Sequence, residues 1–149
     1  MDNERQHQLQ ANIERVLLTR DEIRERTLTL GEEIERDNPG SDLTLLVILH
    51  GSILFAADLM RAMTLPVYLE SFRVASYHGG TSSTGNVQME RSESLKRLAG
   101  KDVLIVDDIL DTGNTLNAVT GFLRGEIGAA SVRSCVLLDK QVPRAVEFD

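Results

Sequence analysis

The stretch that most constrains this chain is VLIVDDILDTGNTL, residues 103–116, where an apolar run leads through acids into a small polar turn. The run 103–106 is rich in β-branched side chains, which is typical of a strand buried on both faces of a sheet. A helix is predicted over residues 116–123, directly after the turn. Free backbone N–H groups at a helix N-terminus favour phosphate. The stretch therefore predicts a strand, an acidic tip, an anion site and a helix, in that order.

Three carboxylates in this stretch narrow the choice of ligand: Asp107, Asp108 and Asp111. Acids repel a bare phosphate, so their partner should be sugar hydroxyls, a hydrated Mg²⁺ or a cationic transition state. A ligand with a diol beside the acids and a phosphate in the turn is a ribose 5-phosphate. The structural alternative is a strand end with solvated acids before a capped helix.

Composition sets the broad class of the protein. With 149 residues, we expect a polar N-terminal segment over 1–12 and one domain over 13–149. The net charge of −7 argues against a broad nucleic-acid surface. No apolar run approaches the roughly 18 residues of a membrane span, and the N-terminus lacks the apolar core of a signal peptide. The single cysteine, Cys135, stands in an apolar run, so we expect a core residue and a cytoplasmic protein.

Elsewhere, short apolar runs alternate with amphipathic segments. We expect further strands over residues 16–18, 43–49, 66–72 and 131–138, and helices from a cap at Thr19 to about Asp37 and over 53–63. This alternation predicts an α/β fold with a doubly wound, mainly parallel sheet and helices on both faces. Ligand loops of such sheets lie at the carboxyl ends of the strands. We therefore expect one site to collect the residues that follow the apolar runs: His50, Ser76, Asp107 and Lys140.

The stretch 103–116 resembles the PRPP (phosphoribosyl pyrophosphate) signature of type I phosphoribosyltransferases, a hydrophobic run and two acids followed by D-[ST]-G-x-T. His50-Gly51-Ser52 is similar to the pyrophosphate loop of the hypoxanthine-type members, in which Lys, Arg or Asn precedes Gly-Ser. The Gly- and Ser-rich segment 76–85 is either a lid or a plain hairpin tip, and it resembles the family's flexible catalytic loop. Lys140, the last residue of the segment Leu137-Leu138-Asp139-Lys140, matches the family's purine-binding lysine. Overall, the chain looks most like the hypoxanthine-guanine phosphoribosyltransferases.

The resemblance implies transfer of ribose 5-phosphate from PRPP to a 6-oxopurine, hypoxanthine or guanine, with Mg²⁺ required. It assigns the ribose hydroxyls to Asp107 and Asp108. It assigns Mg²⁺ to the same two residues, either directly or through PRPP or water. It makes Asp111 the acid/base beside the purine N7. It assigns the 5′-phosphate to Asp111, Thr112, Gly113, Asn114 and Thr115. It assigns pyrophosphate to His50, Gly51 and Ser52, the flexible loop to Ser76 and Tyr77, and the purine to Lys140.

Two alternatives stay open at single residues. His50 is either a protonated ring that faces pyrophosphate or a bystander whose backbone N–H binds. Lys140 is either the purine lysine or an exposed residue at a strand end.

The C-terminus departs from the family pattern, because the family's C-terminal hood over the base has no counterpart between Lys140 and Asp149. We therefore expect the hood to be absent, which leaves two hypotheses for function. The first is a purine-salvage transferase, and the second is a PRPP- or nucleotide-binding regulator without turnover. The resemblance also implies a homodimer or homotetramer, and we expect neither a membrane nor a nucleic acid as a partner.

Overall fold

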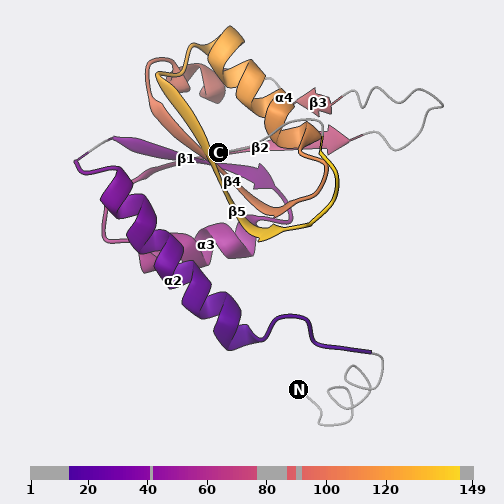
Figure 1. Cartoon of the computed structure of the whole chain (residues 1–149). Coiled ribbons are helices and arrows are strands. Elements are labelled where there is room, and N and C mark those ends of the chain that lie inside the picture. The colour runs from indigo at the N-terminus through magenta and orange to yellow at the C-terminus, as the bar shows by residue number, and fades with distance from the viewer. Residues whose placement is uncertain (1–13, 41, 77–86, 90–91, 145–149) are drawn as a thin grey trace, which may run out of the picture.

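The structure is a computed structural model that describes residues 14–40, 42–76, 87–89 and 92–144 (Figure 1). Its elements, in chain order, are α2 (Arg20–Asp37), β1 (Leu43–Leu49), α3 (Ile53–Ala62), β2 (Tyr68–Ser76), β3 (Val87–Met89), the 3₁₀-helix η1 (Glu93–Leu98), β4 (Asp102–Leu110), α4 (Asn114–Phe122), the π-helical turn η2 (Leu123–Ile127) and β5 (Ser131–Asp139).

The strands form one sheet in the order β3-β2-β1-β4-β5. Among the described strands, β2, β1, β4 and β5 run parallel, and the short edge strand β3 pairs antiparallel with β2. The predicted mainly parallel sheet is confirmed. In a parallel sheet all carboxyl ends lie at one edge, so the segments that follow β1, β4 and β5 are brought together there.

Helices cover both faces of the sheet, as predicted (Figure 1). Leu45 and Val47 of β1 pack in a cluster with α2 and α3, whereas Leu46 and Ile48 pack in a second cluster with α4. This arrangement explains why six of the seven residues of β1 are apolar, since both of its faces are buried. Cys135 lies in the α2–α3 cluster, and the expectation of a core cysteine is confirmed.

The helix α2 begins and ends where its sequence indicates. Thr19 and Glu22 form a capping box, in which the Glu22 carboxylate accepts from the Thr19 backbone N–H at 2.7 Å. The helix stops at Asn38, two residues before Gly40, which has a φ of 71°. A Cβ on Gly31 would lie 3.1 Å from the Cβ of Ala62, so this glycine lets α2 pack closely against α3.

Several predicted elements differ from the structure. The strand expected over 16–18 is wrong, because no neighbouring strand pairs with these residues in the described ranges and their side chains are exposed by 47% to 73%. The strand expected over 66–72 instead runs from Tyr68 to Ser76, where its partners on β1 and β3 lie. β4 continues through Asp107 and Asp108 to Leu110, because β5 pairs with it as far as Asp139.

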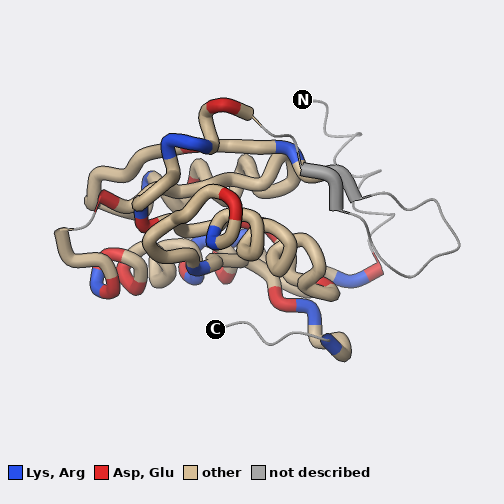
Figure 2. The backbone as a smooth tube through the Cα atoms, turned by 90° about the horizontal axis from the view of Figure 1, so that it is seen from above, with Lys and Arg blue, Asp and Glu red and all other residues tan. Residues whose placement is uncertain are grey.

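Charged positions of both signs are interspersed along the described chain (Figure 2). Within the described ranges, no helix combines the length and the apolar character that a membrane crossing requires.

Candidate active site

The carboxyl edge of the sheet brings together the segments that the sequence singled out. A Cβ on Gly51 would lie 2.5 Å from Oδ2 of Asp108, so the loop after β1 touches an acid of β4. The Nζ of Lys140, after β5, lies 3.0 Å from Oδ2 of Asp111, after β4. Ser76 ends β2, and Tyr77 lies outside the described residues. Three chain segments far apart in sequence therefore meet at this edge.

The turn between β4 and α4 forms an anion-binding geometry. Gly113 is the N-cap residue of α4, with a φ of 81° that favours glycine, and no side chain caps the helix. The N–H groups of the first helical turn have no partner within the helix and remain available to a ligand. A small cavity of about 80 Å³ lies here, and it is lined by Asp107, Ile109, Leu110, Asp111, Thr112, Gly113, Asn114, Thr115 and Leu116.

Asp107 is a perturbed carboxyl at the mouth of this turn. Burial raises the pKa of Asp107 to about 6. Its Oδ1 accepts the Asp108 backbone N–H at 3.1 Å, which opposes the rise, while the negative charge of Asp108 adds to it. A perturbed carboxyl in a polar recess is characteristic of functional sites.

These two acids also set what metal the site could hold. No cluster of three or more His, Cys, Asp or Glu side chains in the described ranges is arranged to bind a metal. Asp107 and Asp108 supply only hard oxygen donors, which suit Mg²⁺, and Mg²⁺ commonly binds through one or two carboxylates together with substrate phosphates and water. The donor set therefore fits a magnesium ion that arrives with a phosphorylated ligand.

The pair formed by Asp111 and Lys140 is open to solvent, with side chains exposed by 51% and 53%. An exposed ion pair contributes little to stability, and a ligand can separate it at low cost. The arrangement offers a carboxylate and an ammonium to one bound molecule.

Arg144, which the sequence did not single out, ties the segment after β4 to the segment after β5. Its Nε donates to the Asp111 carbonyl at 2.9 Å, and its Nη2 donates to the Leu110 carbonyl at 3.3 Å and the Lys140 carbonyl at 2.5 Å. It also forms an ion pair with Asp139. The two residues of the exposed pair thus stand on backbone that Arg144 fixes.

The loop after β1 presents two exposed residues, His50 and Gly51, followed by a buried one. Ser52 is fully buried, and its hydroxyl donates to the Ile48 carbonyl. Arg73 of β2, which the sequence did not single out either, lies beside the loop. Its Nη2 is 3.1 Å from Nε2 of His50. No sequence signal marks Arg73, because its place depends on the register of β2 against β1.

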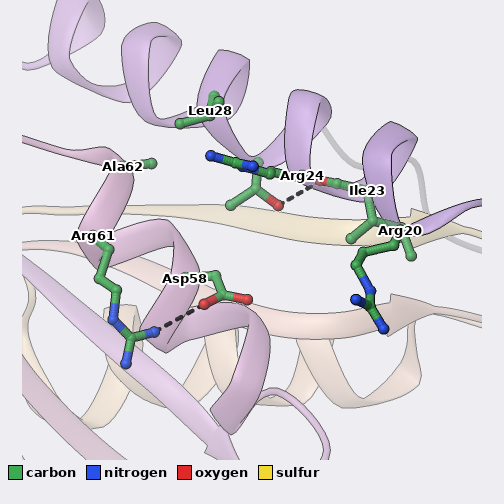
Figure 3. A pocket seen from close by; sticks show the side chains of 8 residues that line it. Arg20, Ile23, Arg24, Leu28, Asp58, Arg61 and Ala62 are labelled. Carbon is green, nitrogen blue, oxygen red and sulfur yellow. Dashed lines mark hydrogen bonds and ion pairs between the residues drawn. The ribbon is translucent and has the colours of Figure 1, made fainter.

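A larger hollow, of about 750 Å³, lies away from this edge, between α2 and α3 (Figure 3). Figure 3 shows Asp58 and Arg61 of α3 facing one another, at 2.8 Å. The hollow is lined by Arg20, Ile23, Arg24, Thr27, Leu28, Asp58, Arg61 and Ala62. None of the site residues predicted from the sequence lines it.

Known proteins resemble this chain in both sequence and structure. The sequence profile of the phosphoribosyl transferase domain matches residues 20–147. The chain is 38% identical over 143 residues to the hypoxanthine-guanine phosphoribosyltransferase of Streptococcus pneumoniae, covering 95% of this chain and 77% of that protein. The crystal structure of a Staphylococcus aureus hypoxanthine phosphoribosyltransferase superposes with a TM-score of 0.82 at 35% identity, covering 95% of this chain and 76% of that chain.

A second solved structure is the hypoxanthine phosphoribosyl transferase of Trypanosoma cruzi, studied for the role of its C-terminal region in oligomeric state and enzymatic activity. It gives a TM-score of 0.79 at 36% identity and covers 91% of this chain and 74% of that chain. The similarity in sequence and in structure therefore extends over almost the whole chain.

Proposed function

This chain belongs to the phosphoribosyltransferase family, and on that premise we propose that it transfers the ribose 5-phosphate of PRPP to a 6-oxopurine in the cytoplasm. The products are pyrophosphate and the nucleoside 5′-monophosphate of hypoxanthine or guanine, which is a purine-salvage reaction. The observation that carries the proposal is the 3.0 Å contact between Lys140 Nζ and Asp111 Oδ2. It supports the proposal because the ammonium of Lys140, which would donate to the base, lies beside the last acid of the PRPP-like stretch.

The turn before α4 would bind the 5′-phosphate. Its free N–H groups and the helix dipole favour the phosphate, and Thr112 and Thr115 add hydroxyl donors. Asp111 and Asn114 complete this turn through their backbone. Because the sugar is covalently joined to that phosphate, its hydroxyls would then reach Asp107 and Asp108.

The residue types suit the charge that develops in the reaction. Breaking the C1–pyrophosphate bond leaves positive charge on the sugar, which the carboxylates of Asp107 and Asp108 stabilise. As the purine forms its new bond to C1, it loses a proton, and Asp111 would accept that proton at N7. His50, Gly51 and Ser52 would lie beside the departing pyrophosphate.

Magnesium fits this site. Asp107 and Asp108 would hold it together with oxygens of PRPP and water, directly or through those groups. When bound, Mg²⁺ offsets the negative charge of the leaving pyrophosphate.

Lys140 would set the choice of base. An ammonium is a donor without acceptor capacity, so it binds the exocyclic oxygen of a 6-oxopurine and gives no hydrogen bond to the amino group of adenine. We therefore expect hypoxanthine and guanine to react and adenine to fail.

The test is product formation by the purified chain with PRPP, Mg²⁺ and a panel of hypoxanthine, guanine, xanthine and adenine, alongside PRPP binding by calorimetry. Nucleotide formation from the 6-oxopurines alone is the expected result. PRPP binding without any turnover would instead favour the regulator. Sedimentation of the same sample checks the homodimer or homotetramer that we propose as its assembly.

A further inference from the structure

The loop after β1 has no fixed positive charge of its own. Ser52 is buried, with its hydroxyl bonded to the Ile48 carbonyl, which leaves His50 and Gly51 as the exposed residues. The helix that follows, α3, has no charged residue before Asp58. A polyanion bound at this loop therefore needs a cation from a neighbouring element.

Arg73 is placed to supply that cation. Its strand, β2, is parallel to β1, and Leu49, the residue before His50, lies opposite Arg73 in the register. The guanidinium reaches the loop from the side, with Nη2 3.1 Å from His50 Nε2. Both side chains are exposed, so a ligand at the loop can touch them.

The hydrogen bond between these two residues assigns the charge. A guanidinium stays protonated and can only donate. Nε2 of His50 must therefore accept, which leaves the imidazole neutral with its proton on Nδ1. In this arrangement His50 orients the guanidinium, and Arg73 carries the positive charge.

Among the described residues, no carboxylate offsets the charge of Arg73. Of the cations described at this edge, Lys140 pairs with Asp111 and Arg144 pairs with Asp139. Arg73 has no carboxylate partner in the described part of the chain, where its side chain makes a polar contact with His50.

The other charged groups near the loop are acids on the far side. Asp108 of β4 touches Gly51, and Asp107 precedes it on the same strand. A ligand bound at the loop after β1 would therefore meet the acids of β4 on one side and the cation of β2 on the other.

We propose that Arg73 is the fixed cation of the pyrophosphate subsite and that neutral His50 is its positioning partner. This inference rests on the proposed function, and it names the residue that replaces the basic residue usual before Gly-Ser in the related enzymes. The ligand it recognises is the pyrophosphate group, either within PRPP or as the released product.

The direct test is calorimetric titration of inorganic pyrophosphate with Mg²⁺ into the wild-type chain and into Arg73→Gln, Arg73→Lys and His50→Gln. Loss of a charge-assisted hydrogen bond should make Arg73→Gln bind pyrophosphate about 10- to 100-fold more weakly, and Arg73→Lys should recover most of this loss. The matched control Arg24→Gln, which removes an exposed cation from α2, should stay within about twofold. Binding of the nucleoside 5′-monophosphate, which lacks pyrophosphate, should be unchanged in Arg73→Gln.

The pH profile separates Arg73 from His50. If Arg73 carries the charge and His50 is neutral, the ratio of wild-type to His50→Gln affinity for pyrophosphate should be the same at pH 5.5 and pH 8, because the titration of the ligand cancels in the ratio. These two pH values lie on either side of about 6.5, the usual pKa of an imidazole. A ratio that falls as the pH rises would make a protonated His50 the cation and overturn the proposal. Wild-type pyrophosphate affinity in Arg73→Gln would overturn it as well.

Failure of the inference and failure of the proposed function give different results. Turnover by the wild-type chain with no effect of Arg73→Gln on pyrophosphate affinity leaves the function standing and overturns the role of Arg73. Pyrophosphate binding that depends on Arg73, without turnover of any purine, supports the role of Arg73 and removes the transferase function. Thermal unfolding of each variant, measured first, checks that the exposed substitutions leave the fold intact.

Discussion

The carboxyl edge of the sheet and the hollow between α2 and α3 differ in size and in chemistry. Judged by cavity volume alone, the hollow would be taken for the functional site. The recess at the edge is the small cavity of about 80 Å³ before α4, and the hollow between α2 and α3 has a volume of about 750 Å³. Yet the recess joins a free helix N-terminus to two acids, Asp107 and Asp111, whereas the hollow lies between two helices that meet through Gly31 and Ala62. The comparison teaches that parallel strand ends, rather than the volume of a hollow, locate the chemistry in this fold.

The largest effect that would sharpen this comparison is expected at Asp111. Replacing a proton acceptor by an amide, Asp111→Asn, should lower kcat by about 10²- to 10⁴-fold and change PRPP affinity by less than about threefold. Steady-state kinetics and PRPP calorimetry measure the two quantities. Asp58→Asn, the same change in the hollow, is the matched control and should leave kcat within about twofold. Equal losses of kcat and PRPP affinity in Asp111→Asn would point to a binding role instead.

The next largest effect is expected at the contact between two strand ends. In Gly51→Ala, the new Cβ would sit 2.5 Å from Asp108 Oδ2, so either the loop or the carboxylate must move. We expect the KM for PRPP to rise by about tenfold, because small displacements of positioning groups are costly. The control is Gly121→Ala on α4, where a Cβ would meet nothing within 4 Å and should cost nothing in KM. An unchanged KM in Gly51→Ala would mean that the loop and Asp108 do not act on one ligand.

Sequence patterns predicted most of the sheet and the gathering of its strand ends at one edge. β1 runs from Leu43 to Leu49 as expected, because an apolar run between turns has few other ways to be buried. The same reasoning failed at residues 16–18, where three apolar residues have no strand to pair with in the described structure. A strand requires a partner, and local sequence does not indicate one.

Arg73 and Arg144 show why the rest of the site could not be predicted. Arg73 meets His50, 23 positions away, only through the register of β2 against β1. Arg144 meets the Asp111 carbonyl, 33 positions away, only because β4 and β5 end side by side. Both contacts are consequences of strand pairing, so no local motif marks either arginine.

Asp107 should show a smaller effect that separates stability from activity. Its pKa of about 6 in the folded chain is above the usual value of 3.8, so the folded state holds more protons than the unfolded state between these pH values. Stability from this group is present below pH 4 and is lost as the pH rises through about 6. Asp107→Asn should therefore stabilise the chain at pH 7.5 by on the order of 1 kcal/mol, a figure reduced for solvent screening, and by much less at pH 4.5.

Urea unfolding at the two pH values measures this difference, and PRPP turnover should fall in the same variant. A gain in stability that is equal at both pH values would show that burial of the charged carboxylate is not its cause. A gain without loss of turnover would remove Asp107 from the site.

The smallest effect is expected in the hollow between α2 and α3. This prediction tests whether the functional site is confined to the carboxyl edge. Leu28 of α2 lines the hollow with about half of its side chain exposed. Leu28→Gln keeps a good helix former and buries no new polar group, so kcat and KM should stay within about twofold and the free energy of unfolding within ~0.5 kcal/mol. Steady-state kinetics and urea unfolding measure both. A tenfold change in either kinetic constant would give the hollow a functional role that its lining does not suggest, and catalysis could then no longer be assigned to the strand ends alone.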